Sequence, residues 1–183
     1  MDFSSIETWG YLAIAFFSFG GSFLIVATAG VFAYLGKIDL VTAMAVAIIF
    51  NFLGDNFLFY LGRYQKKDIQ KYLKKYRRKL AITTILMRKY GNLAIFIQKF
   101  IYGVKTLIPI IMGLGKYDFK KFIFFNFFAS IIFVLTIGLS AYFFSDIIIV
   151  IFNYIKTRPY LAPLTLIVIG GAIWQYLKKL EQK

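Results

Sequence analysis

Residues 40–62 read LVTAMAVAIIFNFLGDNFLFYLG, an almost unbroken apolar run that contains a single acid, Asp55. A helix of about 20 such residues is long enough to cross the hydrocarbon core of a bilayer once. The whole 183-residue chain has the same character, since 60% of its residues are hydrophobic, 20% are aromatic and only 16% are charged. Soluble domains are nearer to about 45–50% apolar. The sequence therefore predicts an integral membrane protein in which 40–62 is a spanning helix.

Other apolar segments lie on both sides of this run, separated by polar or basic breaks. We predict a single membrane-embedded domain over residues 1–183. Its expected parts are an N-terminal helix or re-entrant element at 9–36, a basic amphipathic segment at 63–89, a re-entrant element at 92–114, spanning helices at 119–144 and 160–177, and an interfacial stretch at 146–155.

The basic residues set the expected orientation and the expected partners. The formal net charge is +14, which in a soluble protein would suggest nucleic acid. Here the charge flanks apolar segments, above all in 63–89, where apolar residues recur at helical spacing among lysines and arginines. Such a helix lies on the membrane surface among anionic headgroups. We therefore expect membrane lipids as partners, and no nucleic acid, while a homo-oligomer stays open. The positive-inside rule places 63–89 and the C-terminus in the cytoplasm.

This orientation makes 92–114 a re-entrant element. If both later helices cross once, the turn at 116–121 is cytoplasmic like the basic segment, so 92–114 begins and ends on the same side. Two lysines and Pro109 interrupt it. Broken backbone at membrane depth is tolerated only beside protein or water, which fits a segment that enters the membrane and returns.

A short repetition suggests a second re-entrant element. Residues 36–40 (GKIDL) resemble residues 115–119 (GKYDF), and each precedes a long apolar helix. The first helix enters the cytoplasm and the second leaves it, which is typical of an inverted repeat. By this symmetry, 20–36 enters the membrane from the outside. The predicted fold class is an all-α membrane protein: an inverted repeat of two re-entrant hairpins plus spanning helices, with a basic amphipathic surface helix.

The composition disfavours an enzyme. The chain has no Cys and no His, which removes thiol chemistry and the most common general base and transition-metal ligand. No phosphate-binding glycine-rich loop or nucleophile elbow is present. We expect no catalytic residues, no metal and no cofactor.

Asp55 is the first candidate for a functional residue. A carboxylate inside an apolar helix is costly unless it is paired, hydrated or protonated, and such a position suits proton binding. The alternative is a structural salt bridge to Arg63, one or two helical turns away. Arg63 could itself bind a lipid phosphate or act as an interfacial anchor.

Lys99 and Lys105 are candidates for ion pairing or for binding a lipid phosphate. Both lie inside the predicted re-entrant element, and they flank Gly103. Buried lysines need a partner such as Asp55, a phosphate or water, whereas lysines near a segment end extend to the headgroups. We favour a polar cavity.

Two pairs of polar residues have structural interpretations. Asn51 and Asn126 occupy matching Phe-Asn-Phe contexts on the two long helices, where hydrogen bonds between helices are the favoured role. Asp39 and Asp118 fall in turns, where helix capping is the expected role.

Several motifs in order resemble the DedA family, also called the SNARE-associated or VTT-domain family. The match covers roughly residues 28–145. The matching residues are Gly54-Asp55, Tyr60-Leu61-Gly62-Arg63, Lys89-Tyr90-Gly91, the run Lys99-Phe100-Ile101-Tyr102-Gly103-Val104-Lys105-Thr106, Pro109, Met112-Gly113, Phe122 and Asn126.

The resemblance implies a fold and a function. It implies paired re-entrant hairpins with spanning helices, and transport or scrambling of lipids such as phospholipids or undecaprenyl phosphate, linked in bacteria to the proton gradient. The family's functional acid corresponds to Asp55, and its two functional arginines correspond to Lys99 and Lys105. Lysine keeps the charge but loses bidentate phosphate geometry. The family's Pro is Tyr102 here, and 22–29 lacks the usual Pro and Glu, which puts proton coupling in doubt.

The sequence thus favours a lipid transporter, scramblase or flippase of the bacterial inner membrane. Anionic headgroups would be held near Lys99 and Lys105, and Asp55 would alternate between a lysine and a proton. Two alternatives stay open: a small-ion channel or exchanger that uses the same charges, and a membrane scaffold whose basic segment recruits partners.

Overall fold

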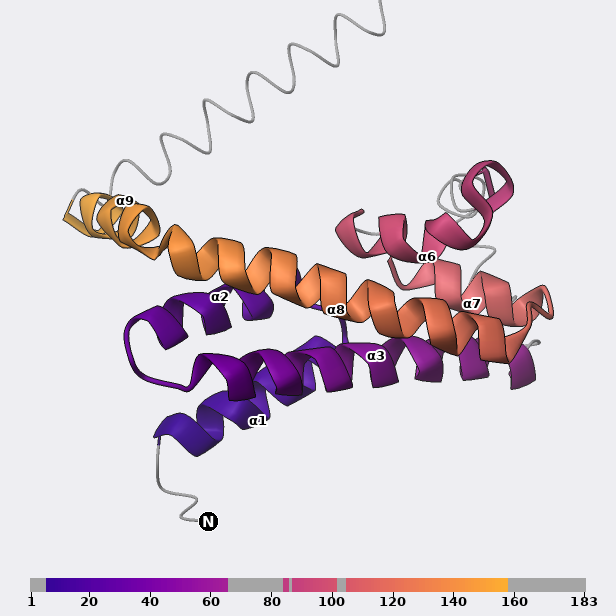
Figure 1. Cartoon of the computed structure of the whole chain (residues 1–183), viewed down its shortest axis with the longest axis horizontal. Coiled ribbons are helices and arrows are strands. Elements are labelled where there is room, and N and C mark those ends of the chain that lie inside the picture. The colour runs from indigo at the N-terminus through magenta and orange to yellow at the C-terminus, as the bar shows by residue number, and fades with distance from the viewer. Residues whose placement is uncertain (1–5, 66–83, 86, 102–104, 158–183) are drawn as a thin grey trace, which may run out of the picture. The chain divides into compact units, whose positions relative to one another are not determined.

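The computed structural model describes residues 6–65, 84–85, 87–101 and 105–157 (Figure 1). These residues form helices and turns, with no strand among them. The chain divides into two compact units, residues 1–143 and 144–183. In the second unit the described part is α9 (Ser145–Thr157), which coincides with the predicted interfacial stretch. Most of the predicted basic segment, residues 66–83, and the predicted last helix at 160–177 lie outside the described residues.

The first unit is built around two long antiparallel helices. These are α3 (Leu40–Tyr64) and α8 (Phe119–Phe143), each of 25 residues. Both are long and apolar enough to cross a membrane, and their bounds lie within two residues of the predicted spanning helices. Phe59, near the end of α3, stacks on Phe122, near the start of α8, at 4.5 Å between ring centroids.

Shorter helices lie beside this pair (Figure 1). The N-terminal ones are α1 (Ile6–Phe19) and α2 (Phe23–Tyr34), joined by a turn in which Gly21 has φ of 71°. The predicted element at 92–114 is divided into η1 (Gly91–Leu93), α6 (Ala94–Ile97), η2 (Gln98–Phe100) and α7 (Leu107–Leu114). Pro109 is tolerated in α7 because it lies in the first turn, where no intrahelical donor is lost.

Two short helices, α2 and α7, each pack mainly on the long helix that does not follow them directly in the chain, and we call them the exchanged helices. α2 precedes α3 in the chain but packs mainly on α8, whereas α7 precedes α8 but packs mainly on α3. Glycines permit both contacts. A Cβ added at Gly30 of α2 would lie 2.3 Å from the carbonyl oxygen of Gly138, and one at Gly113 of α7 would lie 2.2 Å from that of Phe59. Small residues at such contacts let helices approach closely in a membrane.

Equivalent turns lead into the two long helices. Lys37 N–H donates to the Phe32 carbonyl, and Tyr117 N–H donates to the Met112 carbonyl, so α2 and α7 end in the same hydrogen-bonding pattern. This pattern requires a left-handed residue, which is Gly36 at φ 66° in one turn and a non-glycine residue in the other, at φ 57°. The structure therefore pairs residue 36 with residue 116, one position away from the alignment of GKIDL with GKYDF.

An aspartate begins each long helix. The Asp39 Oδ1 atom accepts from the Thr42 N–H at 2.7 Å, and the Asp118 Oδ1 atom accepts from the Lys121 N–H at 2.8 Å. Both are the capping contacts that the sequence predicted. The hydrogen bonds from the side chain and the backbone of Thr42 lower the pKa of Asp39 below its ordinary value of 3.8.

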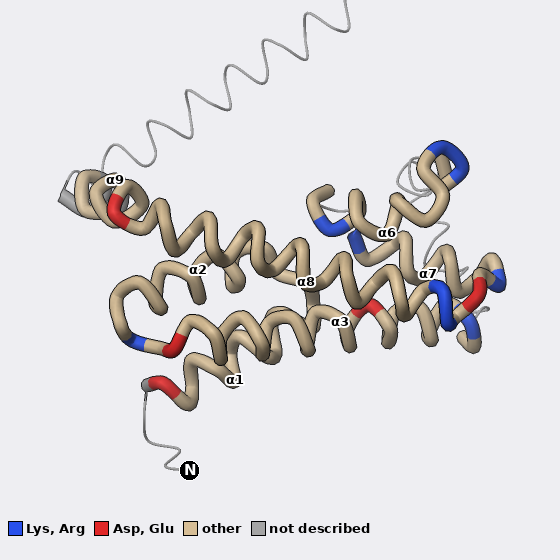
Figure 2. Tube along the Cα trace, in the orientation of Figure 1, with Lys and Arg blue, Asp and Glu red and all other residues tan. Residues whose placement is uncertain are grey.

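The two ends of the long helices differ in charge. Figure 2 shows basic residues gathered where α3 ends and α8 begins. They include Arg63, Lys116, Lys120 and Lys121. At the opposite end Glu7 and Asp39 are joined through Tyr11, which donates to the Glu7 carboxylate and accepts from the Asp39 N–H at 2.8 Å.

The two larger apolar clusters of the core lie one toward each end. The first contains Met44 of α3 and Phe133 of α8, and the second contains Phe59 of α3 and Phe122 of α8. Between them, along both helices, lie buried polar residues. The candidate site therefore occupies the middle of the helix pair rather than an end.

Candidate functional site

A buried lysine with a complete set of acceptors forms the centre of the site. The ammonium group of Lys99 donates to the Asp55 carboxylate at 2.7 Å, to Asn51 Oδ1 at 2.7 Å and to Ser130 Oγ at 2.9 Å. Lysine has three N–H donors, so all of them are used. The Lys99 and Asp55 side chains are 0% and 4% exposed. Among the described residues this is the one salt bridge.

Helical spacing explains how these groups converge. Asn51 and Asp55 are four residues apart on α3, and Asn126 and Ser130 are four residues apart on α8. Residues at this spacing lie on one helix face, one turn apart. The two polar faces meet, and the Asn126 amide donates to the Phe52 carbonyl at 3.2 Å. At about 1.5 Å per residue, Asp55 lies about 14 Å from the last residue of α3.

Lys105 is buried nearby but is held differently. Its ammonium group donates to the Gly21 carbonyl at 2.7 Å, which links the α6–α7 connection to the turn between α1 and α2. It also lies 4.0 Å from the centroid of the Phe133 ring, a favourable position for a cation. The residue is 9% exposed. No acid among the described residues forms a salt bridge with it.

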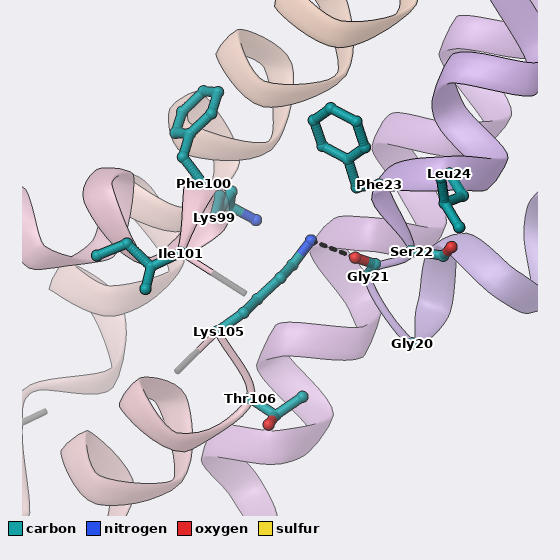
Figure 3. Close-up of a pocket in the computed structure, with 10 residues that line it drawn as sticks. All are labelled: Gly20, Gly21, Ser22, Phe23, Leu24, Lys99, Phe100, Ile101, Lys105 and Thr106. Carbon is teal, nitrogen blue, oxygen red and sulfur yellow. Dashed lines mark hydrogen bonds between the residues drawn. The ribbon is translucent and has the colours of Figure 1, made fainter. Parts of the chain in front are cut away.

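A pocket of about 810 Å³ lies beside both lysines (Figure 3). Its walls are residues 20–24 from the α1–α2 turn, residues 99–101, Lys105 and Thr106. In Figure 3 the Lys105 side chain extends across toward Gly21, while Phe23 and Phe100 stand at the margin. Phe23, Leu24 and Phe100 are 48%, 75% and 49% exposed. The pocket thus combines buried cations with an exposed apolar rim.

Arg63 lies apart from this group. Its guanidinium group donates to the Tyr117 carbonyl and lies 5.2 Å from the centroid of the Phe59 ring. Asp55 therefore pairs with Lys99 and not with Arg63. Tyr117 also donates to the Asn92 side chain, and partial burial raises the pKa of its phenol.

Among the other motif residues, Gly54 and Gly62 are points of close contact between helices. A Cβ at Gly54 would lie 1.9 Å from the Phe19 carbonyl oxygen, and one at Gly62 would lie 2.2 Å from that of Ile110. Tyr60 is 53% exposed and its ring packs on Tyr64. Gly91 has φ of 52°, and Pro109 is buried in α7. Gly103 lies outside the described residues.

Sequence reasoning missed three participants. Asn51 bonds between helices as predicted, but its partner, Lys99 of η2, places it in the site, and that role was not foreseen. Ser130 received no role, and Gly21 was noted only as part of a re-entrant element. The matched spacing of polar residues four apart in both long apolar helices is a signal that could have identified Asn51 and Ser130.

The chain has counterparts among known proteins. The VTT domain family matches residues 11–143. An uncharacterised membrane protein of Buchnera aphidicola subsp. Schizaphis graminum is 34% identical over 99 residues, which are 53% of this chain and 39% of that protein. A second, from Buchnera aphidicola subsp. Acyrthosiphon pisum, is 31% identical over 103 residues, which are 55% and 40% of the two chains. The matched parts are thus about two fifths of these relatives. No solved structure matches.

The family match extends from within α1 to the end of α8, so it includes Asp55, both buried lysines and the pocket. It covers well over half of the chain, and both relatives are named as membrane proteins. The protein therefore belongs to the VTT-domain (DedA) family of membrane proteins.

Proposed function

We propose that this protein moves lipids with anionic headgroups across the bacterial inner membrane, as a transporter or scramblase. The observation that supports this most directly is the Asp55–Lys99 ion pair, buried in the middle of α3 and α8 beside a pocket that also contains Lys105. Charged residues at membrane depth are costly and commonly mark transport pathways.

The pocket favours a lipid over a small ion as the transported species. Its buried cations attract a phosphate, while its exposed rim of Phe23, Leu24 and Phe100 is apolar. A headgroup could enter between these side chains while its acyl chains stay in the bilayer. A pathway for hydrated ions would need a polar rim instead.

The arrangement in the membrane follows the same proposal. The turn at 20–22 and the segment that contains Lys105 and Thr106 are the tips of two re-entrant hairpins that meet through Lys105 and Gly21. α3 and α8 span the bilayer, and the basic end of the pair faces the cytoplasm. The two halves are then inverted repeats around a site near the membrane midplane.

Asp55 provides a route to proton coupling. In the ion pair its carboxylate neutralises Lys99. When Asp55 binds a proton, Lys99 becomes an uncompensated buried cation, which favours entry of an anion. Proton and headgroup would then stabilise the same state, and a proton gradient could bias the direction of movement.

Lipid translocation in proteoliposomes tests the proposal. We expect Asp55→Asn and Lys105→Ala each to reduce the rate of headgroup exchange between leaflets by at least about tenfold, equivalent to 1.4 kcal/mol. Wild-type rates in both variants would refute the mechanism. Ion current without lipid movement would indicate a channel or exchanger. Loss of function only on neutralising the basic residues at 66–83 would indicate a scaffold.

A further inference from the structure

The two buried lysines are not equally free to bind a ligand. Lys99 already uses its three donors on Asn51, Asp55 and Ser130. Lys105 uses one donor, on the Gly21 carbonyl. A phosphate could therefore bind Lys105 without breaking any contact of Lys99. Lys105 is therefore the buried lysine of this pocket that has donors to offer to a ligand.

The beginning of α2 contributes to the wall of the same pocket. Residues 20–24 line it, and they include the first residues of α2. The N–H groups at the start of a helix have no intrahelical acceptors and attract anions. The Gly21 and Ser22 N–H groups donate to the Ser18 and Phe17 carbonyls, and Ser22 caps the Ile25 N–H. The first two N–H groups of α2, those of Phe23 and Leu24, are therefore the ones available to a ligand. Lys105, bonded to Gly21, lies next to them.

While Asp55 and Lys99 remain an ion pair, the charges around the pocket amount to a single positive charge. Lys99 and Asp55 neutralise each other, Lys105 has no acid in a salt bridge among the described residues, and the adjoining residues 102–104 (Tyr-Gly-Val) carry no charge. A buried site is most stable when its charges balance, because an unpaired charge in a low-dielectric environment is costly. One negative charge on the ligand satisfies this condition, and two do not.

We propose that the pocket selects a singly charged phosphodiester headgroup, held by Lys105 and the N-terminus of α2, and discriminates against a doubly charged phosphomonoester. This rests on the proposed function in taking a membrane lipid as the ligand. Phosphatidylglycerol is a probe of the first class and phosphatidic acid of the second. The second ionisation of a phosphomonoester has a pKa of about 6, so acidification converts phosphatidic acid to a monoanion.

Lipid-dependent thermal stabilisation of the full-length protein in detergent tests binding independently of transport, because a ligand of the native state raises the unfolding temperature. At about pH 7 we expect the apparent affinity for phosphatidylglycerol to exceed that for phosphatidic acid by about tenfold or more. Near pH 5.5 the ratio should fall toward one, because both lipids are then largely monoanions. Diacylglycerol, which lacks the phosphate, should have no effect.

Single substitutions test whether Lys105 binds the lipid phosphate. Lys105→Met should abolish stabilisation by phosphatidylglycerol, and Lys105→Arg should retain it because the charge is kept. Lys37→Met removes an exposed lysine near the turn before α3 and should behave as wild type. If Lys105→Met does not fold, the comparison of the two lipids in wild-type protein still decides the matter.

Three results would overturn the proposal. The first is equal or tighter binding of phosphatidic acid at pH 7, and the second is stabilisation by phosphatidylglycerol that persists in Lys105→Met. The third is equal competition by soluble dimethyl phosphate, which would assign the site to a soluble phosphodiester. Selective binding through Lys105 without translocation would instead refute the proposed transport while leaving the site's selectivity in place.

Discussion

The two halves of the first unit, residues 23–64 and 107–143, share a scaffold but differ in their charges. Each has a short helix, a turn with a left-handed residue, an aspartate cap and a 25-residue helix. Among the described residues, the buried acid lies on α3 of the first half, and the buried lysines, Lys99 and Lys105, lie in the segment just before the second half. The shared features hold the two long helices together, while the candidate site depends on what the halves do not share.

The largest loss of stability should follow the removal of either member of the Asp55–Lys99 ion pair. Asp55→Leu leaves Lys99 as an uncompensated buried cation, and Lys99→Met leaves Asp55 as an uncompensated buried anion. Removing one partner of a buried pair costs about 3–5 kcal/mol. The double variant leaves no unpaired charge, so it should recover most of that loss. A double-mutant cycle on thermal unfolding in detergent measures the coupling.

Additive effects of the two substitutions would contradict this expectation, because independent residues show no coupling energy. All three variants should fail to translocate lipid, since each lacks the acid or its partner. Recovery of stability without recovery of transport would separate the structural role of the pair from its proposed role in transport.

The exchanged helices offer a second, smaller test of the shared scaffold. A Cβ at Gly30 would lie 2.3 Å from the Gly138 carbonyl oxygen, whereas one at Gly138 would lie 2.3 Å from the sulfur of Met44. Backbone cannot move aside, but a methionine side chain can. Gly30→Ala should therefore cost about 1–3 kcal/mol, and Gly138→Ala less than about 1 kcal/mol.

Two further glycines, at the contact between α3 and α7, extend this comparison. Gly62 and Gly113 both face backbone carbonyl oxygens at 2.2 Å, so alanine at either position should be as damaging as alanine at Gly30. Thermal unfolding of the four single variants gives the ranking. Equal losses at Gly30 and Gly138 would show that Met44 is fixed in place.

The sequence predicts features that depend on residues close together in the chain, and it does not predict contacts between distant segments. The long helices were placed within two residues, because an apolar run bounded by charges marks its own ends. The caps Asp39 and Asp118 were also identified, since they act on residues three positions away. Local chemistry explains both successes.

Contacts between distant segments could not be predicted in the same way. Nothing in the local sequence states that α2 packs on α8 rather than on α3. Asp55 could have paired with Arg63 or with either lysine, and only the fold brings Lys99 to it. Asn51 and Asn126 have matching neighbours in the sequence, yet they act differently because Lys99 reaches only one of them.

The two turns provide the smallest test, which concerns the one left-handed residue that each contains, Gly36 or Lys116. A residue with a Cβ pays about 1–2 kcal/mol in this conformation, which Gly36 avoids and Lys116 does not. A glycine also loses about 0.5–1 kcal/mol through its greater freedom in the unfolded chain. Lys116→Gly should therefore stabilise the protein by no more than about 1.5 kcal/mol, and Gly36→Ala should destabilise it by a similar amount.

Gly36 makes this a test of backbone conformation alone, because a Cβ built there meets nothing within 4 Å. A loss in Gly36→Ala would thus reflect the left-handed conformation and not a clash. Thermal unfolding of both variants in detergent measures the two changes. Opposite signs would show that the turns are energetically equivalent and that the second half tolerates a strained lysine. If Lys116→Gly were destabilising, the lysine side chain would have a stabilising contact of its own at the basic end of the helix pair.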